Sequence, residues 1–425
     1  MGALSRKTFG SIKSPVEYWI PNPGLIDIQI NGAYGFDFSG QDYDEEAYQK
    51  GLNMVIEKIV ETGVTSLVPT VVTQDRALYP NALQRLRPSS NRKSAAILGW
   101  HAEGPFLDSS KRGAHSPAWL ADAPEGFKSI EETYGSTNVS TNQDWRKGGA
   151  IDGDTVGARI VTLAPEVQGI LDAIEELTNR GIVVSMGHSA ATSVVAMEAA
   201  KRGASLITHL FNAMPQLHHR DPAIIGLLGA SSKSQRTPPI QKLVEATSDR
   251  AEALDSSVSP NPTPGVQGTT SPVPQFKRPF YTIIADGVHL HPQSIKMAYS
   301  TFPEGCVLMT DALHILDPHL KDGVHEWHHG KKVFKDGDKL YVHGTTTLCG
   351  SCVTLDKCVR NLTEFTEISL GEAIKCATFN PAKCLGIEAR KGTLRPGADA
   401  DLVVFDEHGI PQSTWIKGRK VWTQN

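Results

Sequence analysis

Apolar runs alternate with helix-like segments along most of this chain, and this alternation limits the possible folds more than any other feature. The first run, residues 25–31, is β-branched and bounded by Pro and Gly, as a buried strand would be. Strands that alternate with helices pair in parallel, and eight of them close into a barrel. We therefore predict an α/β fold, a TIM-like (β/α)8 barrel, with strands at 25–31, 64–72, 95–100, 158–163, 182–187, 205–210, 280–285 and 306–310.

Helix-like segments fill several of the gaps between these strands. Two of them stop before a glycine, Gly181 or Gly203, as helices commonly do at their C-termini. Helices are expected at 43–62, 167–179, 193–201 and 370–384, and a hairpin-like loop near the barrel mouth at 322–345.

Two segments interrupt the alternation. Residues 124–157 are rich in Gly, Ser, Thr, Asn and Asp, which predicts a surface excursion. Residues 231–278 are poor in aromatic residues and rich in Pro, Ser, Thr and Gln. Because that composition buries too little apolar surface to become ordered, we predict a disordered insertion between strands six and seven.

A second, smaller unit is expected beside the barrel. The tail, residues 386–425, consists of short strands and tight turns. Only residues 1–20 precede the barrel, and Trp19 and Ile20 are the only N-terminal contribution that we expect to the small unit. The chain therefore divides into an N-terminal remnant (1–20), the barrel (21–385) and the C-terminal part of a small β-domain (386–425).

Composition and charge argue against several classes of partner. The formal net charge of −4 gives no broad basic field for nucleic acid or an anionic membrane. We find no apolar segment long enough to span a bilayer and no signal-peptide core, so a cytoplasmic location is expected. All six cysteines lie in the last third of the chain, and we expect free thiols.

Three predicted strands end in residues that can bind a metal. Glu103 follows the third strand, His188 the fifth and His209 the sixth. A single buried histidine at a strand end is usually a core residue, but three donors at three strand ends favour a metal site. One carboxylate and two imidazoles suit one divalent ion, Zn²⁺ or a similar borderline metal, and leave a coordination position for water.

Polar residues also end the last two strands. Asp311 could act as a general base that takes a proton from water and passes it to a leaving amine, or it could cap the next helix. His289 ends strand seven, where an imidazole could polarise a carbonyl. His291 forms a metal-pair pattern with His289, but the proline after it indicates that it turns away.

Other residues are suited to bind a phosphate. The backbone N–H groups of residues 211–214 could receive an anion, and Arg220 offers a guanidinium fork that fits a phosphate. His115 could add a further donor. Each of these residues could instead be a solvated surface residue.

Six motifs indicate a family. They are PGLIDIQING at 23–32, HAEGPF at 101–106, GHSAAT at 187–192, THLFNAM at 208–214, DGVH at 286–289 and TDA at 310–312. With them the chain resembles the N-acetylglucosamine-6-phosphate deacetylases of the amidohydrolase superfamily. Most amidohydrolases carry His-x-His on the first strand, whereas this chain has Gln29-x-Asn31, as the deacetylases do, which argues for fewer metals.

The resemblance implies hydrolysis of the acetamide of N-acetylglucosamine 6-phosphate to glucosamine 6-phosphate and acetate. It implies that Glu103, His188 and His209 hold the metal and that Asp311 carries the proton. Homodimers are usual in the family, and a partner can complete the phosphate site. The implied substrate contacts are Ala114, His115, Asn212, Ala213, Arg220, His289 and a closing loop formed by Leu348, Cys349 and Gly350.

Two departures from the family leave other hypotheses open. Members usually have a longer N-terminal segment, so we expect a small β-sandwich domain that is shortened at its N-terminus, and the 231–278 insertion is unusual. The chain could be another metal-dependent amidohydrolase that acts on a different amide. It could also be a catalytically silent, truncated barrel with a binding role.

Overall fold

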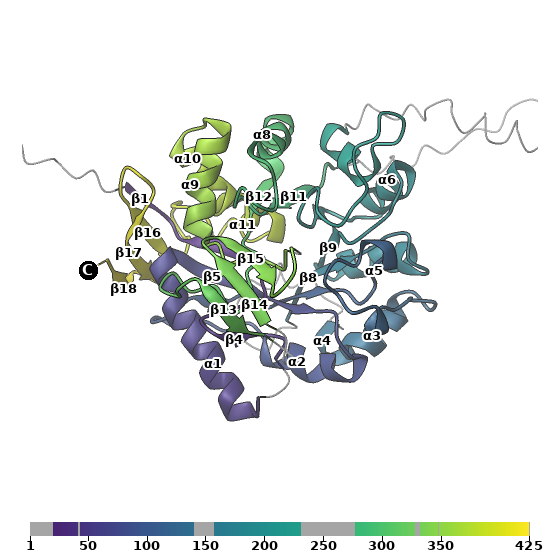
Figure 1. Ribbon diagram of the computed structural model, residues 1–425, viewed down its shortest axis with the longest axis horizontal. Helices are drawn as coiled ribbons and strands as arrows, with labels where there is room; N and C mark the ends of the chain where they lie inside the picture. Colours follow the sequence, from purple (N-terminus) through teal and green to yellow (C-terminus); the bar gives the residue numbers. More distant parts are fainter. Residues whose placement is uncertain are drawn as a thin grey trace, which may run out of the picture.

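Eight parallel strands form the centre of the computed structural model, which describes residues 20–40, 43–139, 157–230, 277–327, 332–346 and 348–424 (Figure 1). Each strand pairs with the next in chain order, so that neighbouring strands run in the same direction throughout. The strands are β2 (Leu25–Ile30), β5 (Val64–Val72), β7 (Trp100–Glu103), β8 (Ala158–Leu163), β9 (Val183–Met186), β10 (Leu206–Ile207), β11 (Phe280–Ile283) and β12 (Cys306–Leu308). The short β6 (Ala96–Ile97) pairs with β5.

Backbone hydrogen bonds join the first strand to the segment after the last one. The N–H of Asp311 donates to the carbonyl of Gln29 at 2.9 Å, and the N–H of Asn31 donates to Ala312 at 2.8 Å. The hydroxyl of Thr310 also donates to Asp27 Oδ2 at 2.6 Å. The predicted (β/α)8 barrel is therefore confirmed, and Asp311 lies beside the end of β2.

The helices cover the outside of the barrel. They are α1 (Glu45–Lys58), α2 (Tyr79–Arg85), α3 (Phe127–Tyr134), α4 (Ser136–Val139), α5 (Ile170–Asn179), α6 (Ser193–Lys201), α8 (Pro292–Thr301), α9 (Leu355–Thr366), α10 (Leu370–Cys376) and α11 (Phe379–Leu385). The prediction for residues 193–201 is confirmed by α6. The single helix predicted over 370–384 is wrong, because α10 ends at Cys376 and α11 begins at Phe379.

The predicted surface excursion at 124–157 is wrong for its described part. Residues 124–139 contain α3 and α4, and Ile130, Tyr134 and Val139 are fully buried. Ile130 and Tyr134 are four residues apart and therefore lie on one face of α3. A composition averaged over the whole segment hides this local pattern. Residues 140–156 lie outside the described residues, as does the insertion predicted at 231–278 up to residue 276.

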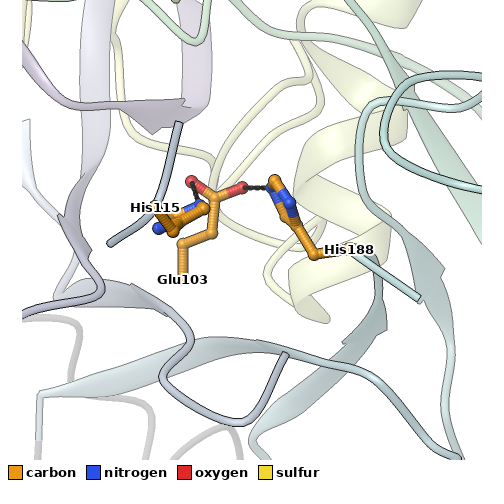
Figure 2. Close-up of side chains that lie close together, drawn as sticks. All are labelled: Glu103, His115 and His188. Carbon is orange, nitrogen blue, oxygen red and sulfur yellow. Dashed lines mark hydrogen bonds and ion pairs between the residues drawn. The ribbon is translucent and has the colours of Figure 1, made fainter. Parts of the chain in front are cut away.

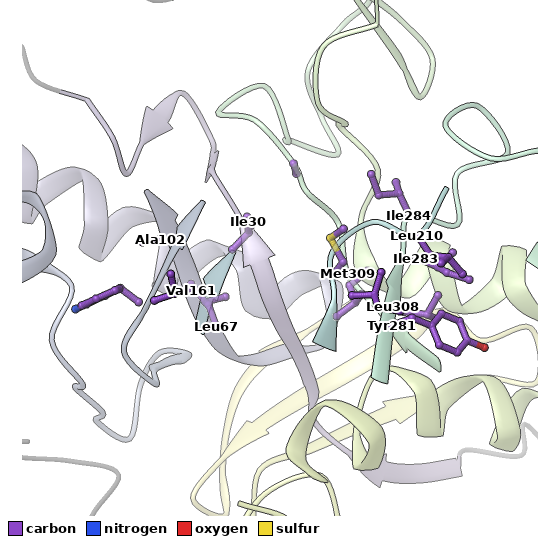
Figure 3. Close-up of a cluster of buried hydrophobic side chains, with 14 of the residues drawn as sticks. Ile30, Leu67, Ala102, Val161, Leu210, Tyr281, Ile283, Ile284, Leu308 and Met309 are labelled. Atoms are coloured by element: carbon purple, nitrogen blue, oxygen red, sulfur yellow. The ribbon is translucent and has the colours of Figure 1, made fainter. Parts of the chain in front are cut away.

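Two hydrophobic clusters stabilise the fold. The larger one includes residues of both the strands and the helices that cover them, and Figure 3 shows some of its side chains. The smaller one takes residues from strands all around the ring, such as Ile28, Ile160 and Val307, so it fills the barrel interior. It includes Leu385 of α11. The interior is therefore packed, as in other barrels of this type, and the polar site sits at the carboxyl ends of the strands.

A four-stranded antiparallel sheet lies beside the barrel. Its order is β1 (Ile20–Pro23), β16 (Leu402–Phe405), β17 (Pro411–Ile416) and β18 (Arg419–Thr423). Figure 1 shows the yellow C-terminal strands next to the purple β1. The hydroxyl of Thr414 donates to the carbonyl of Val60 at 2.7 Å and links this sheet to the barrel. The expected small β-domain is confirmed, and β1 crosses the boundary predicted after residue 20.

Short strands also form near the barrel mouth. β13 (Gly323–Glu326), β14 (Lys332–Asp336) and β15 (Lys339–Val342) make an antiparallel sheet within the hairpin-like region predicted at 322–345. β3 (Gly32–Ala33) and β4 (Phe36–Asp37) form a small ladder after β2. Of the helices that the structure describes, none has the length and apolar character needed to cross a membrane.

Candidate metal centre and active site

The three predicted metal ligands converge at one point. Glu103 Oε1 lies 3.2 Å from His188 Nε2 and 3.2 Å from His209 Nε2. The two Nε2 atoms are 3.0 Å apart. All three residues are buried, each with at most 6% of its surface exposed. Residues from three different strand ends, 106 positions apart at the extremes, therefore place their donor atoms together as predicted.

The other nitrogen of each imidazole fixes which atom faces this point. His188 Nδ1 lies 2.9 Å from the carbonyl of Lys111, and His209 Nδ1 lies 3.2 Å from the carbonyl of Asn212. Because a carbonyl only accepts, each Nδ1 carries a proton, so the Nε2 atoms are the ones that face Glu103. When a cation is bound, each ring would present the lone pair of Nε2 to it.

The spacing of the donors fits a divalent ion. Ligand atoms about 2.0–2.1 Å from a tetrahedral zinc ion lie about 3.3 Å from one another. The observed 3.0–3.2 Å is close to that value. Burial alone raises the pKa of Glu103, but its contacts with the two imidazoles outweigh burial and hold that pKa well below its usual range. Glu103 is thus ionised, as a metal ligand must be.

His115 joins the same group of donors. Its Nε2 is 4.0 Å from Glu103 Oε2, and its ring packs edge-on against His188 with centroids 4.5 Å apart (Figure 2). Glu103, His115 and His188 could also hold an ion, since their donor atoms lie within 4.8 Å of one another. The shorter distances of His209 make it the better third ligand. Burial lowers the pKa of His115 to about 3, so the ring is neutral and offers a phosphate no charge.

Asp311 lies next to the metal ligands. Its Oδ1 accepts hydrogen bonds from Gln29 Nε2 at 3.2 Å and from Asn31 Nδ2 at 2.9 Å. Gln29 Nε2 also donates to Glu103 Oε1 at 3.1 Å and so links the two carboxylates. Burial, with a further contribution from Glu103, raises the pKa of Asp311 to about 6. The donors are side chains of Gln29 in β2 and of Asn31 just after it, not the backbone N–H groups of a following helix, which argues against the helix-capping alternative.

One cavity of about 930 Å³ contains these groups. Its lining includes all the predicted metal ligands and Asp311. It also includes most of the predicted substrate contacts, namely Ala114, His115, Asn212, Ala213, His289, Leu348, Cys349 and Gly350. Arg220 is exposed and is not among the lining residues, so its contact with a phosphate stays a prediction. His291 caps α8 instead of facing the site, as predicted.

Comparison with known proteins identifies the family. The amidohydrolase family profile matches residues 22–421. The chain belongs to the amidohydrolase family. It is 39% identical to the N-acetylglucosamine-6-phosphate deacetylase of Danio rerio over 94% of this chain and 84% of that protein. For the enzyme of the same name from Bacillus subtilis, the identity is 31% over 90% of this chain and 79% of that protein.

A solved structure supports the same assignment. The chain resembles a mutant of N-acetyl-D-glucosamine-6-phosphate deacetylase from Mycobacterium smegmatis, solved in complex with N-acetyl-D-glucosamine-6-phosphate. The TM-score is 0.69 with 25% identity, and the match covers 95% of this chain and 87% of that one. The enzyme from Thermotoga maritima has the same TM-score at 24% identity, which shows the shared fold.

Backbone strain marks the strand ends of this amidohydrolase. His188, His209 and Asp311 have positive φ angles of 48°, 32° and 48°. Residues other than glycine rarely adopt this conformation, which costs about 1–3 kcal/mol each and commonly occurs at functional sites. The strain therefore falls on residues that direct side chains into the cavity.

A buried layer of hydrogen-bonded polar groups precedes the proposed metal ligands along the strands. His101 Nε2 lies 2.7 Å from the hydroxyl of Thr162, which lies 2.7 Å from that of Thr208. Burial lowers the pKa of His101 to about 4, so this imidazole is neutral. His101 is thus a hydrogen-bonded core residue, although it stands two positions before Glu103 in the same motif.

Several lining residues of the amidohydrolase cavity were not predicted. Gln74 follows the second strand, so the rule that located Glu103 and His209 also applies to it. Trp119 and Trp327 lie outside the barrel strands, on segments without a periodic pattern, and nothing in the sequence distinguishes them from surface aromatics. The other unpredicted lining residues include Asp37, Tyr43 and Glu326.

Proposed function

We propose that this chain hydrolyses the acetamide of N-acetylglucosamine 6-phosphate to glucosamine 6-phosphate and acetate. The observation that carries the proposal is the convergence of Glu103, His188 and His209 in a cavity that also holds Asp311. The relatives from Danio rerio and Bacillus subtilis, which match most of the chain, are deacetylases of that name, and this supports the choice of substrate.

Glu103, His188 and His209 would hold one divalent ion, and their donor set suits Zn²⁺. When bound, such an ion lowers the pKa of a coordinated water and polarises the amide carbonyl. The amide nitrogens of Gln29 and Asn31 occupy the position where many amidohydrolases have two histidines. Because Gln29 Nε2 donates to both carboxylates, it fills this position with a hydrogen bond and supports a single ion.

Asp311 would move the proton during the reaction. Its carboxylate accepts a proton from the attacking water and then delivers it to the amine nitrogen as the C–N bond breaks. A pKa of about 6 suits both steps, because the group is mostly ionised at pH 7 and yet can hold a proton. Gln29 and Asn31 both bind Oδ1 and so fix the orientation of this carboxylate.

The sugar phosphate would bind in the cavity beside these groups. Ala114, His115, Asn212, Ala213 and His289 lie along its wall, and the loop 348–350 closes one side. Arg220 is exposed outside the lining, and the partner in a homodimer would complete the phosphate site. We also propose a cytoplasmic location, because all six cysteines are free and buried.

Metal analysis combined with an acetate-release assay tests the proposal. The purified protein should contain about one divalent ion per chain and release acetate from N-acetylglucosamine 6-phosphate. Comparable turnover of N-acetylglucosamine without phosphate would point to another amidohydrolase activity, because binding of the phosphate would then contribute nothing to turnover. Full metal content without turnover of either substrate would favour a catalytically silent barrel. N-acetylgalactosamine 6-phosphate serves as a comparison, since a 28% identical relative from Escherichia coli is a deacetylase named for that sugar.

A further inference from the structure

The turn after β11 carries a carboxylate and an imidazole in close contact. Asp286 and His289 stand at the two ends of the DGVH motif. The side chain of Asp286 is fully buried and does not line the cavity, whereas His289 lines it and its side chain is 12% exposed. The carboxylate therefore lies behind the imidazole, out of reach of a substrate.

Both oxygens of this carboxylate bind the turn. Oδ1 accepts the backbone N–H groups of Val288 and His289, each at 2.8 Å. Oδ2 lies 2.6 Å from His289 Nδ1, at the short end of charge-assisted hydrogen bonds. Among the described residues no lysine or arginine forms an ion pair with Asp286, so three N–H donors of the turn satisfy the buried charge.

The packing around the turn restricts its movement. Gly287 has a φ of +72°, and a Cβ at that position would come within 3.1 Å of the ring of Phe365 in α9. Asn361, also in α9, donates to the carbonyl of Ala285 at 2.8 Å. The imidazole thus stands on a segment that is held both by its own carboxylate and by a neighbouring helix.

We propose that Asp286 is a positioning residue that keeps Nδ1 of His289 protonated and presents Nε2 to the substrate. The inference rests on the proposed deacetylation, in which His289 contacts the substrate. A carboxylate can only accept, so the hydrogen bond to Oδ2 requires a proton on Nδ1. With the proton on Nδ1, the lone pair of the ring lies on Nε2, the atom that is left to face the substrate.

Replacing Asp286 with asparagine should move the ring proton of His289 from Nδ1 to Nε2, while the shape of the side chain at position 286 is kept. Its oxygen can still accept the N–H groups of Val288 and His289. Its amide nitrogen must then face His289 Nδ1, and because that nitrogen donates, the ring proton moves to Nε2. Asparagine in place of the aspartate of a serine-protease triad changes the tautomer in this way and lowers kcat by about 10⁴-fold.

The experiment compares Asp286→Asn with the wild type in two ways. In the zinc-loaded protein labelled with ¹⁵N-histidine, NMR should show the proton of the neutral His289 ring on Nδ1 in the wild type and on Nε2 in the variant. The His289 signals are assigned by their loss in His289→Gln. With N-acetylglucosamine 6-phosphate, we expect kcat to fall by about 100-fold or more, while KM changes only a few-fold.

Asp406→Asn is the matched control. Asp406 Oδ1 accepts the N–H groups of His408 at 2.9 Å and Ile410 at 2.8 Å in a similar turn, and Asp406 is not among the residues that line the cavity. This variant should keep wild-type kcat and metal content. Metal content and thermal midpoint are measured for both variants, so that a loss of folding is recognised.

Two results would overturn the inference. One is a wild-type His289 that carries its proton on Nε2, and the other is a folded Asp286→Asn protein with wild-type kcat. If Asp286→Asn does not fold, the wild-type spectrum alone decides. If the wild type releases no acetate from the sugar phosphate, the proposed function fails, while the NMR measurement still decides the role of Asp286.

Discussion

Replacing Asp27 with asparagine should stabilise the protein at neutral and alkaline pH. Asp27 is buried in the seam between β2 and β12, where Thr310 donates its hydroxyl to Oδ2 at 2.6 Å and its N–H to Oδ1 at 3.3 Å. Burial raises the pKa of this carboxyl from 3.8 to about 7, in spite of these hydrogen bonds. The folded state therefore resists ionisation of a group that ionises readily in the unfolded chain.

The sign and size of the effect follow from these two pKa values. Below pH 3.8 both states are protonated and Asp27 costs nothing. Between 3.8 and about 7 the unfolded state loses its proton first, so stability falls by about 1.36 kcal/mol per pH unit. Above pH 7 the full cost of roughly 4 kcal/mol is reached.

Asparagine removes this cost and keeps most of the contacts. Its oxygen can accept the N–H groups of Gln29 and Thr310, as Oδ1 of Asp27 does. The hydroxyl of Thr310 must turn to accept from the new amide, and it can donate to the carbonyl of Gln29, which lies 3.5 Å away. Allowing about 1 kcal/mol for the poorer hydrogen bond, we expect a net gain of about 2–3 kcal/mol at pH 8.

Urea denaturation of both proteins at pH 5, 6, 7 and 8 measures this difference. The gain in the free energy of unfolding should increase from pH 5 to about 7 and level off towards pH 8. Asp44→Asn, which alters an exposed helix cap, should show no such increase. A variant that is less stable than the wild type by the same amount at every pH would refute the reasoning. That result would mean that Asp27 contributes hydrogen bonds without an ionisation cost.

Three further predictions concern the site. Asp311→Asn should lower kcat by about 10²–10⁴-fold with metal content unchanged, and a variant with wild-type kcat would exclude Asp311 as the proton carrier. In the wild type, kcat/KM should fall as the pH drops through about 6, because the base must be ionised. His209→Ala should lose most of the bound metal in dialysis followed by elemental analysis, whereas retention of the metal would favour the alternative set with His115. His115→Ala should raise KM for the sugar phosphate at unchanged metal content, and loss of the metal would instead make His115 a ligand.

The sequence was sufficient to predict the barrel and the convergence of the three proposed metal ligands, because both depend on a regular pattern. Parallel strands of a barrel end at the same rim, so polar residues at strand ends come together whatever their separation in the chain. Glu103, His188 and His209 follow this rule, and so does Asp311. The length of β10 was overestimated, since it spans only Leu206–Ile207 of the predicted 205–210, but this error does not move His209 from the rim.

Positions on loops could not be predicted in the same way. His115 belongs to a segment without strand or helix periodicity, and only the folded chain shows that its ring packs against His188. The helix predicted at 370–384 failed for a related reason. Its apolar pattern continues across Ala377 and Thr378, but the backbone breaks there, and α11 then packs into the barrel interior. A tertiary contact of this kind leaves no local signal.

Residues at strand ends and residues on loops have different roles in this site. Those at strand ends concern the reaction, and those on loops concern which substrate is accepted. The groups that we propose to hold the metal and to move the proton stand at strand ends, and their positions are fixed by the barrel and by the hydrogen bonds of Gln29 and Asn31. The rest of the wall comes from other segments, including Trp119, Trp327 and residues 348–350. Trp119 and Trp327 lie outside the barrel sheet, so they can change without displacing Asp311. The loop 348–350 is less independent, because the N–H of the adjoining Ser351 donates to the carbonyl of Asp311 at 3.1 Å. Differences among the sugar phosphates that related enzymes accept should therefore correspond to these loop residues, whereas the metal ligands and Asp311 stay the same.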